Sequence, residues 1–264
     1  MTLDNKSPIL VFDSGVGGIS VLKQLTLLMP DEDFIFFGDS KNAPYGTKKP
    51  EEVLELTLGH IKHYLDVGIK GACIACNTAT SASISELRRL YPDLPLAGIE
   101  PAIKPAAEKY PGGRILVMAT PITIAGRKLH KLMDKYSENA EIIPLACPGL
   151  MEFIEEGKID SPELIAFLKK LLKPYIDNPV DAFITGCTHY PFITDKIFDV
   201  LGGKAEPFDG APGTARELKR ILNKHSLLRN DGHKGHINFE DSDPAPEKIE
   251  LCRELYKRPV FNVR

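Results

Sequence analysis

Short apolar runs alternate along this chain with segments whose apolar residues recur at helical spacing. Leu54, Leu58, Ile61 and Leu65, for example, repeat at the spacing of one helix face. Such alternation predicts an α/β fold in which mostly parallel sheets are covered by helices. The predicted strands are Ile9 to Phe12, Phe34 to Phe37, Ala72 to Ala75, Leu94 to Ile99, Ile115 to Ala119, Ile142 to Ala146 and Phe183 to Thr185.

The chain also repeats its own pattern. Residues 114–129 resemble 8–22, and residues 180–203 resemble 69–92. Cys76 and Cys187 occupy matching places in the second pair, just after an apolar strand and just before a helix start. Duplication therefore predicts two similar α/β domains, which would place the two cysteines across a shared cleft if the halves face each other.

Composition and charge exclude several classes of protein. The 33 basic and 36 acidic residues give a net charge of -3, and the basic clusters are short pairs typical of solvated helix faces, so no nucleic-acid partner is expected. The N-terminus lacks a signal-peptide pattern and no apolar run approaches the roughly 20 residues of a membrane span. The five scattered cysteines do not form a disulfide framework. A cytoplasmic protein with reduced thiols and no membrane contact is expected.

Chemically useful residues follow the predicted strands directly. Ligands of parallel α/β sheets bind beyond the carboxyl ends of the strands, so these positions are the first candidates for a site. The glycines of DSGVGGIS match no nucleotide-binding spacing. The residues at these ends are Asp13, Ser14, Asp39, Cys76, Asn77, Thr78, Glu100, Thr120, Cys147, Cys187, Thr188 and His189.

The two matched cysteines are candidate proton carriers. Cys76 precedes Asn77 and Thr78 at a predicted helix start, where the positive helix end favours a thiolate, and His189 is a candidate proton partner for Cys187. A lone cysteine after a strand is more often a small buried residue, but two at matching positions favour catalysis.

Two other uses of the cysteines fit the sequence less well. Cys73 and Cys76 form a C-x-x-C, yet Cys73 lies inside an apolar run, which argues against a redox pair. A zinc site would need Cys73 to reach the same cleft as Cys76, and the alternation of side chains along a strand makes that awkward.

Three further segments have weaker signals. The loop at 38–49 is either a plain surface loop or a lid that contributes Asp39 and the backbone of Tyr45 and Gly46 to a substrate. Glu152 lies near a helix start and by local pattern is a solvated carboxylate. From about Leu227 the composition becomes polar, which predicts a surface tail or small terminal element with one short strand at His236 to Phe239.

Four ordered motifs resemble those of the aspartate/glutamate racemase family. They are FDSGVGG (12–18), GDSKNAPYGTK (38–48), ACNTAT (75–80) and GCTHYP (186–191). The resemblance implies an active site between two α/β domains, formed by residues 1–100 plus 208–264 and by residues 101–207. It also implies catalytic roles for Cys76 and Cys187, with substrate contacts at Asp13, Ser14, Tyr45, Gly46, Asn77, Thr78, Thr188 and His189 and supporting roles for Asp39, Thr120 and Glu152.

The same resemblance implies a reaction. Family members interconvert amino-acid enantiomers with neither pyridoxal phosphate nor metal, and glutamate is the expected substrate, with D-glutamate supplied to peptidoglycan. Cys76 is expected to take the α-proton from the D-enantiomer and Cys187 from the L-enantiomer. A homodimer is the assembly that the family suggests. The alternatives are a racemase for aspartate or another amino acid, and a non-catalytic amino-acid-binding protein on the same fold.

Overall fold

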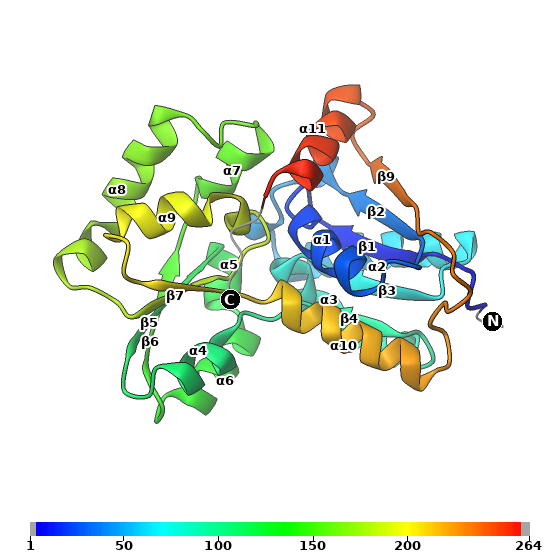
Figure 1. The fold of residues 1–264 in the computed structure, drawn as a ribbon, viewed down its shortest axis with the longest axis horizontal. Coiled ribbons are helices and arrows are strands. Elements are labelled where there is room, and N and C mark those ends of the chain that lie inside the picture. The colour runs from blue at the N-terminus through cyan, green and yellow to red at the C-terminus, as the bar shows by residue number, and fades with distance from the viewer. Residues whose placement is uncertain (1–3, 260–264) are drawn as a thin grey trace. The chain divides into compact units, whose positions relative to one another are not determined.

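The computed structural model describes residues 4–259, which divide into two units of α/β structure (Figure 1). The first unit contains the chain up to Glu100 and then Ala211–Lys257. The second contains Pro101–Gly210, together with Arg258 and Pro259. The chain thus returns to the first unit after completing the second sheet.

The first unit is built on a five-stranded parallel sheet with the order β4-β3-β1-β2-β9. In its central pair, Phe12 of β1 lies opposite Ile74 of β3. The chain therefore leaves both strands at the same edge of the sheet. The strands are β1 (Ile9–Asp13), β2 (Phe34–Gly38), β3 (Gly71–Ile74), β4 (Leu96–Gly98) and β9 (Ile237–Asp241).

The second unit is built on a four-stranded parallel sheet with the order β6-β5-β7-β8. Matching β1–β4 to β5–β8 in chain order gives the same arrangement in both sheets, β4-β3-β1-β2 in the first and β8-β7-β5-β6 in the second. This common topology agrees with the repeat found in the sequence. The strands are β5 (Arg114–Ala119), β6 (Glu141–Ala146), β7 (Ala182–Thr185) and β8 (Glu206–Asp209).

Helices cover both faces of each sheet. In the first unit, α2 and α3 pack on the face that carries Leu10, Phe12 and Ile74, while α1 packs against α10 and α11. Their bounds are α1 (Ile19–Leu28), α2 (Pro50–Val67), α3 (Asn77–Leu90), α10 (Ala211–Lys224) and α11 (Pro246–Lys257), with 3-10 helices η1 (Ser40–Asn42) and η2 (Tyr45–Thr47).

In the second unit, α4 and α6 pack on the face of Ile115, Val117 and Ile184. Helix α8 contacts α7 and α9. The bounds are α4 (Ile103–Lys109), α5 (Pro121–Ala125), α6 (Arg127–Tyr136), α7 (Leu150–Glu155), α8 (Pro162–Asp177) and α9 (Thr194–Val200), with the 3-10 helix η3 (Tyr190–Ile193).

Local signals explain where several of these helices begin and end. Helix α8 starts with Pro162 after Ser161, whose hydroxyl accepts a hydrogen bond from Leu164 N at 3.2 Å. Helix α2 stops at Gly68, whose φ of 101° is a left-handed conformation that glycine adopts without steric cost.

The C-terminal segment is more than a surface tail. Its predicted short strand is present as β9, which pairs in parallel with β2, and α11 follows and packs against α1 and β9. The segment is thus the small terminal element of the two alternatives, and its composition is polar because β9 lies at the sheet edge, where its side chains are at most partly buried.

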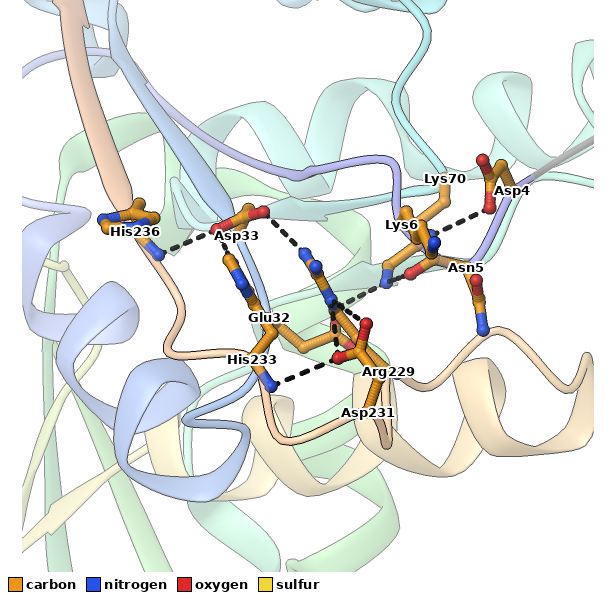
Figure 2. A network of polar contacts seen from close by, with 10 residues as sticks. All are labelled: Asp4, Asn5, Lys6, Glu32, Asp33, Lys70, Arg229, Asp231, His233 and His236. Atoms are coloured by element: carbon orange, nitrogen blue, oxygen red, sulfur yellow. Dashed lines mark hydrogen bonds and ion pairs between the residues drawn. The ribbon is translucent and has the colours of Figure 1, made fainter.

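A polar network ties this segment to the start of β2 (Figure 2). Asp33 Oδ2 accepts a hydrogen bond from Arg229 Nη1 at 2.9 Å. Its other oxygen, Oδ1, accepts from His236 N at 2.8 Å and lies 2.9 Å from His233 Nε2. Burial by itself raises the pKa of Asp33, but these partners lower it below its ordinary value. The network fixes the loop that leads from α10 into β9.

Beside it lies a buried ion pair between Lys70 and Glu32, both almost inaccessible to solvent. Lys70 Nζ also donates to the carbonyl of Asn5, and the other oxygen of Glu32 accepts from Arg229 N at 2.8 Å. Both charges therefore have several partners, as a buried pair requires.

In the described part of the chain, no helix combines the length and apolar character needed to cross a membrane.

Candidate functional site

In the first unit, Cys76 lies two residues beyond the end of β3 and caps helix α3. Its Sγ accepts a hydrogen bond from Ala79 N at 3.4 Å. Ser14, which directly follows the neighbouring strand β1, places its Oγ 3.3 Å from the same Sγ. Only 6% of Cys76 is exposed. A sulfur in this position faces the free N–H groups of the helix, which favour negative charge.

Asp13 ends β1 next to this thiol and is fully buried. Its Oδ1 accepts from Gly15 N at 3.0 Å. The turn that follows packs so closely that a Cβ at Gly18 would lie 2.6 Å from the Cβ of Asp13. The glycine run therefore allows a tight turn around a buried carboxylate.

Asn77 is the residue in this unit that most directly indicates a ligand. Both polar atoms of its side-chain amide are buried, and neither has a hydrogen-bond partner within the described residues. Buried amides are rarely left in this state, because an unsatisfied polar group costs about 1–3 kcal/mol. Its neighbour Thr78 is also buried.

Asp39 organises the loop that follows β2. Its carboxylate accepts from Tyr45 Oη at 2.6 Å and from Asn42 Nδ2 at 3.0 Å, and His60 Nε2 lies 3.1 Å away. Burial by itself raises the pKa of Asp39, but hydrogen bonds from His60, Tyr45 and other neighbours lower it to about 2.

The loop is therefore not a plain surface loop at its centre. Tyr45 is 1% exposed and Gly46 is buried. Burial first, and then the carboxylate of Asp39, raise the pKa of Tyr45, and the charges of Cys76 and Asp13 contribute in the same direction. Tyr45 thus lies within electrostatic reach of the thiol.

In the second unit, Cys187 lies two residues beyond the end of β7 and is 6% exposed. Its Sγ is 3.5 Å from His189 Nδ1, and His189 Nε2 is 2.7 Å from Glu155 Oε1 at the end of α7. Burial by itself lowers the pKa of His189, but hydrogen bonding and charge from Cys187 and then Glu155 raise it well above its ordinary value. The imidazole thus lies between a sulfur and a carboxylate.

The two thiols differ in their surroundings. The prediction of a helix start directly after each cysteine holds for Cys76, but Cys187 is followed by η3 and only then by α9. Cys76 therefore faces a helix N-terminus, whereas Cys187 faces an imidazole.

Glu155 was missed by the sequence analysis, which named Glu152 instead. Both lie in the run EFIEE, three residues apart and thus on one helix face, which was the available signal. Glu152 is half-buried rather than fully solvated as expected, and its Oε2 is buried without a hydrogen-bond partner among the described residues.

The structure also places the remaining residues that the sequence analysis singled out. Thr188 is buried beside Cys187. Thr120 caps α5, accepting from Thr123 N at 3.4 Å, so it has a clear structural role.

Two other cysteines differ from Cys76 and Cys187. Burial raises the pKa of both Cys73 and Cys147 to about 12, so neither thiol is suited to proton transfer near neutrality.

Fold and site together define a class: an α/β protein of two repeated units, each with a thiol beyond the third strand of its repeat. Residues 19–217 match the sequence model of the Asp/Glu/hydantoin racemases. The chain belongs to this family, whose members are isomerases.

Individual relatives agree with this assignment. A glutamate racemase of Clostridium botulinum (strain Langeland) is 47% identical over 96% of this chain and 98% of its own length. Among solved structures, glutamate racemase from Francisella tularensis in complex with D-glutamate has a TM-score of 0.84 at 27% identity, covering 97% of this chain and 96% of that one. The Escherichia coli enzyme in complex with L-glutamate and the activator UDP-MurNAc-Ala has a TM-score of 0.84 at 28% identity and covers 95% of each chain.

Proposed function

We propose that this protein is a glutamate racemase that interconverts L- and D-glutamate by two-base proton transfer without a cofactor. The observation that carries the proposal is the presence of a buried thiol at the equivalent strand end of both repeats, Cys76 beside the N–H of Ala79 and Cys187 beside the imidazole of His189. A racemase must remove a proton from one face of a carbon and return one to the other, and two bases do this better than one.

In this mechanism one cysteine acts as thiolate and the other as thiol, and the roles reverse with the enantiomer. Cys76 removes the α-proton of D-glutamate while Cys187 protonates the opposite face, and L-glutamate reacts in the other direction. Ser14 and the N-terminus of α3 stabilise the thiolate of Cys76. His189, hydrogen-bonded to Glu155, is the proton partner of Cys187.

In a reaction without a cofactor, the carbanion must be stabilised by hydrogen-bond donors that are already in place. The unpartnered amide of Asn77, with Thr78 and Thr188, is suited to the carboxylates of the substrate. Backbone groups of Tyr45 and Gly46 would bind from the loop, and the unpaired oxygen of Glu152 is suited to an ammonium group.

The biological setting follows from the same chemistry. D-glutamate would serve peptidoglycan synthesis. The five cysteines are all free thiols, which fits the reducing cytoplasm. The homodimer stays a prediction.

The test is to incubate the purified protein with each enantiomer of glutamate or aspartate and to follow the circular dichroism signal of the amino acid. Without added cofactor, we expect L- and D-glutamate to lose optical activity, and kcat/KM for aspartate to be at least about 100-fold lower, because a pocket that pairs with a side-chain carboxylate discriminates by its position. Equal or faster turnover of aspartate would reassign the substrate. Binding of glutamate without turnover would indicate a non-catalytic protein.

A second test addresses Glu155. Glu155→Gln removes the carboxylate that keeps His189 charged, so we expect kcat/KM to fall. Carboxylate partners of a histidine in metal sites are worth about 10- to 100-fold, and we expect a loss of similar size. Because the equilibrium constant of racemisation is one, the fall must be equal in both directions. Glu156→Gln, on the neighbouring exposed residue, is the matched control; equal activity of the two variants would exclude the proposed role.

A further inference from the structure

The C-terminal segment does more than complete the sheet. At the end of β9, Asp241 and Ser242 reach the loop Ser40–Thr47, which lies 200 residues earlier in the chain. Asp241 Oδ2 accepts from Ser40 Oγ at 2.8 Å, and Ser242 Oγ accepts from Lys41 N at 3.0 Å. The hydroxyl of Ser242 also contributes to the low pKa of the Asp39 carboxylate.

The backbone brings the two segments into close contact. Gly38 lies opposite Asp241 in the β2–β9 pairing, and Ser242 N donates to Gly38 O at 2.9 Å. A Cβ at Gly38 would lie 2.7 Å from Asp241 Oδ2 and 2.8 Å from the carbonyl oxygen of Gly15. Only glycine permits the carboxylate of Asp241 to approach the strand end in this way.

These contacts lead toward the thiol through one chain of groups. Ser242 Oγ accepts from Lys41 N just after Asp39, and Asp39 accepts from Tyr45 Oη at 2.6 Å. Tyr45 and Cys76 belong to the same cluster of buried side chains. All the residues in this series of contacts belong to the first unit. The position of Tyr45 and Gly46 therefore depends on a segment remote in sequence.

We propose that Asp241 and Ser242 are positioning residues for substrate binding, which hold the Ser40–Thr47 loop so that Tyr45 and Gly46 present their backbone to the substrate carboxylate. This inference rests on the proposed function. Neither residue contacts the reacting atoms, so their loss affects the binding of substrate more than the chemical step.

The test uses Ser242→Ala in the full chain. We expect KM for glutamate to rise about 3- to 10-fold, the range that the loss of one hydrogen bond between neutral groups gives, with kcat changed less than about twofold. Hydrogen exchange of the Lys41 amide, measured without substrate, should become faster because its acceptor is lost. Ser242→Thr restores the hydroxyl and should return both quantities toward the wild-type values.

Two further variants make the result decisive. Ser40→Ala removes a bond from the loop side and should raise KM in the same direction even if Ser242→Ala fails to fold. Glu247→Gln, an exposed change at the start of α11, should alter neither KM nor exchange. Unchanged KM in both alanine variants, or a joint fall of kcat and melting temperature, overturns the proposal. If the wild-type protein does not racemise glutamate, the proposed function fails instead, while amide exchange still reports whether the segment holds the loop.

Discussion

Replacing Cys187 by alanine is expected to abolish racemisation in both directions while leaving slow exchange of the α-proton of D-glutamate. General acid–base groups contribute typically 10²- to 10⁴-fold, so we expect kcat/KM to fall by at least about 10³-fold. In deuterated water, Cys76 can still remove the proton of D-glutamate and return a deuteron to the same face. Mass spectrometry should then show labelled D-glutamate without inversion.

Cys76→Ala should give the mirror result with L-glutamate. In the intact enzyme, deuterium should enter the product first and the remaining substrate only later, because the cysteine that protonates the product carries a deuteron taken from the solvent. Cys252→Ala, which removes another buried thiol of the first unit, is the control and should racemise normally. Near-normal turnover by either active-site variant would remove the two-cysteine assignment. Early label in both substrate and product of the wild type would indicate a single base or a pair of bases that exchange protons freely.

The second large effect is expected on stability. Lys70→Met should lower the free energy of unfolding by about 3–5 kcal/mol, because it leaves the buried carboxylate of Glu32 without its ammonium partner. The double variant Lys70→Met with Glu32→Leu should recover most of this loss, since an apolar pair of similar volume removes both buried charges.

Urea unfolding followed by circular dichroism measures both variants. Lys62→Met, the same substitution at an exposed position of α2, should change the free energy of unfolding by less than about 0.5 kcal/mol. If Lys70→Met were as stable as this control, the pair would not contribute to holding the N-terminal edge of the first sheet. A double variant less stable than Lys70→Met would assign the stabilisation to Glu32 and Arg229 instead.

Much of the fold was predictable because it is written in local pattern. The seven predicted strands are all present, since buried parallel strands are continuous apolar runs that the sequence displays directly. Strand β8 was not among them. In its sequence EPFD only Pro207 and Phe208 are buried, so it has neither an apolar run nor a clear alternation.

Candidate site residues were predictable where they follow a strand. Cys76 and Cys187 stand out because the repeat places them equivalently, and parallel pairing brings strand ends to one edge of a sheet. The glycines that follow β1 and the two cysteine motifs can likewise be recognised in the sequence alone. Their assignment to a catalytic role remains a prediction for the isotope experiment.

The sequence by itself determined the fold class, the repeat and the two thiols, because each depends on apolar periodicity or on residues adjacent in the chain. Only the tertiary structure decided that Glu155 rather than Glu152 meets His189, and that Asp241 and Ser242 hold the loop of Tyr45. These contacts join residues 34 to 201 positions apart. Packing chooses among several carboxylates or hydroxyls of equal local propensity, and that choice depends on distances that local pattern does not contain.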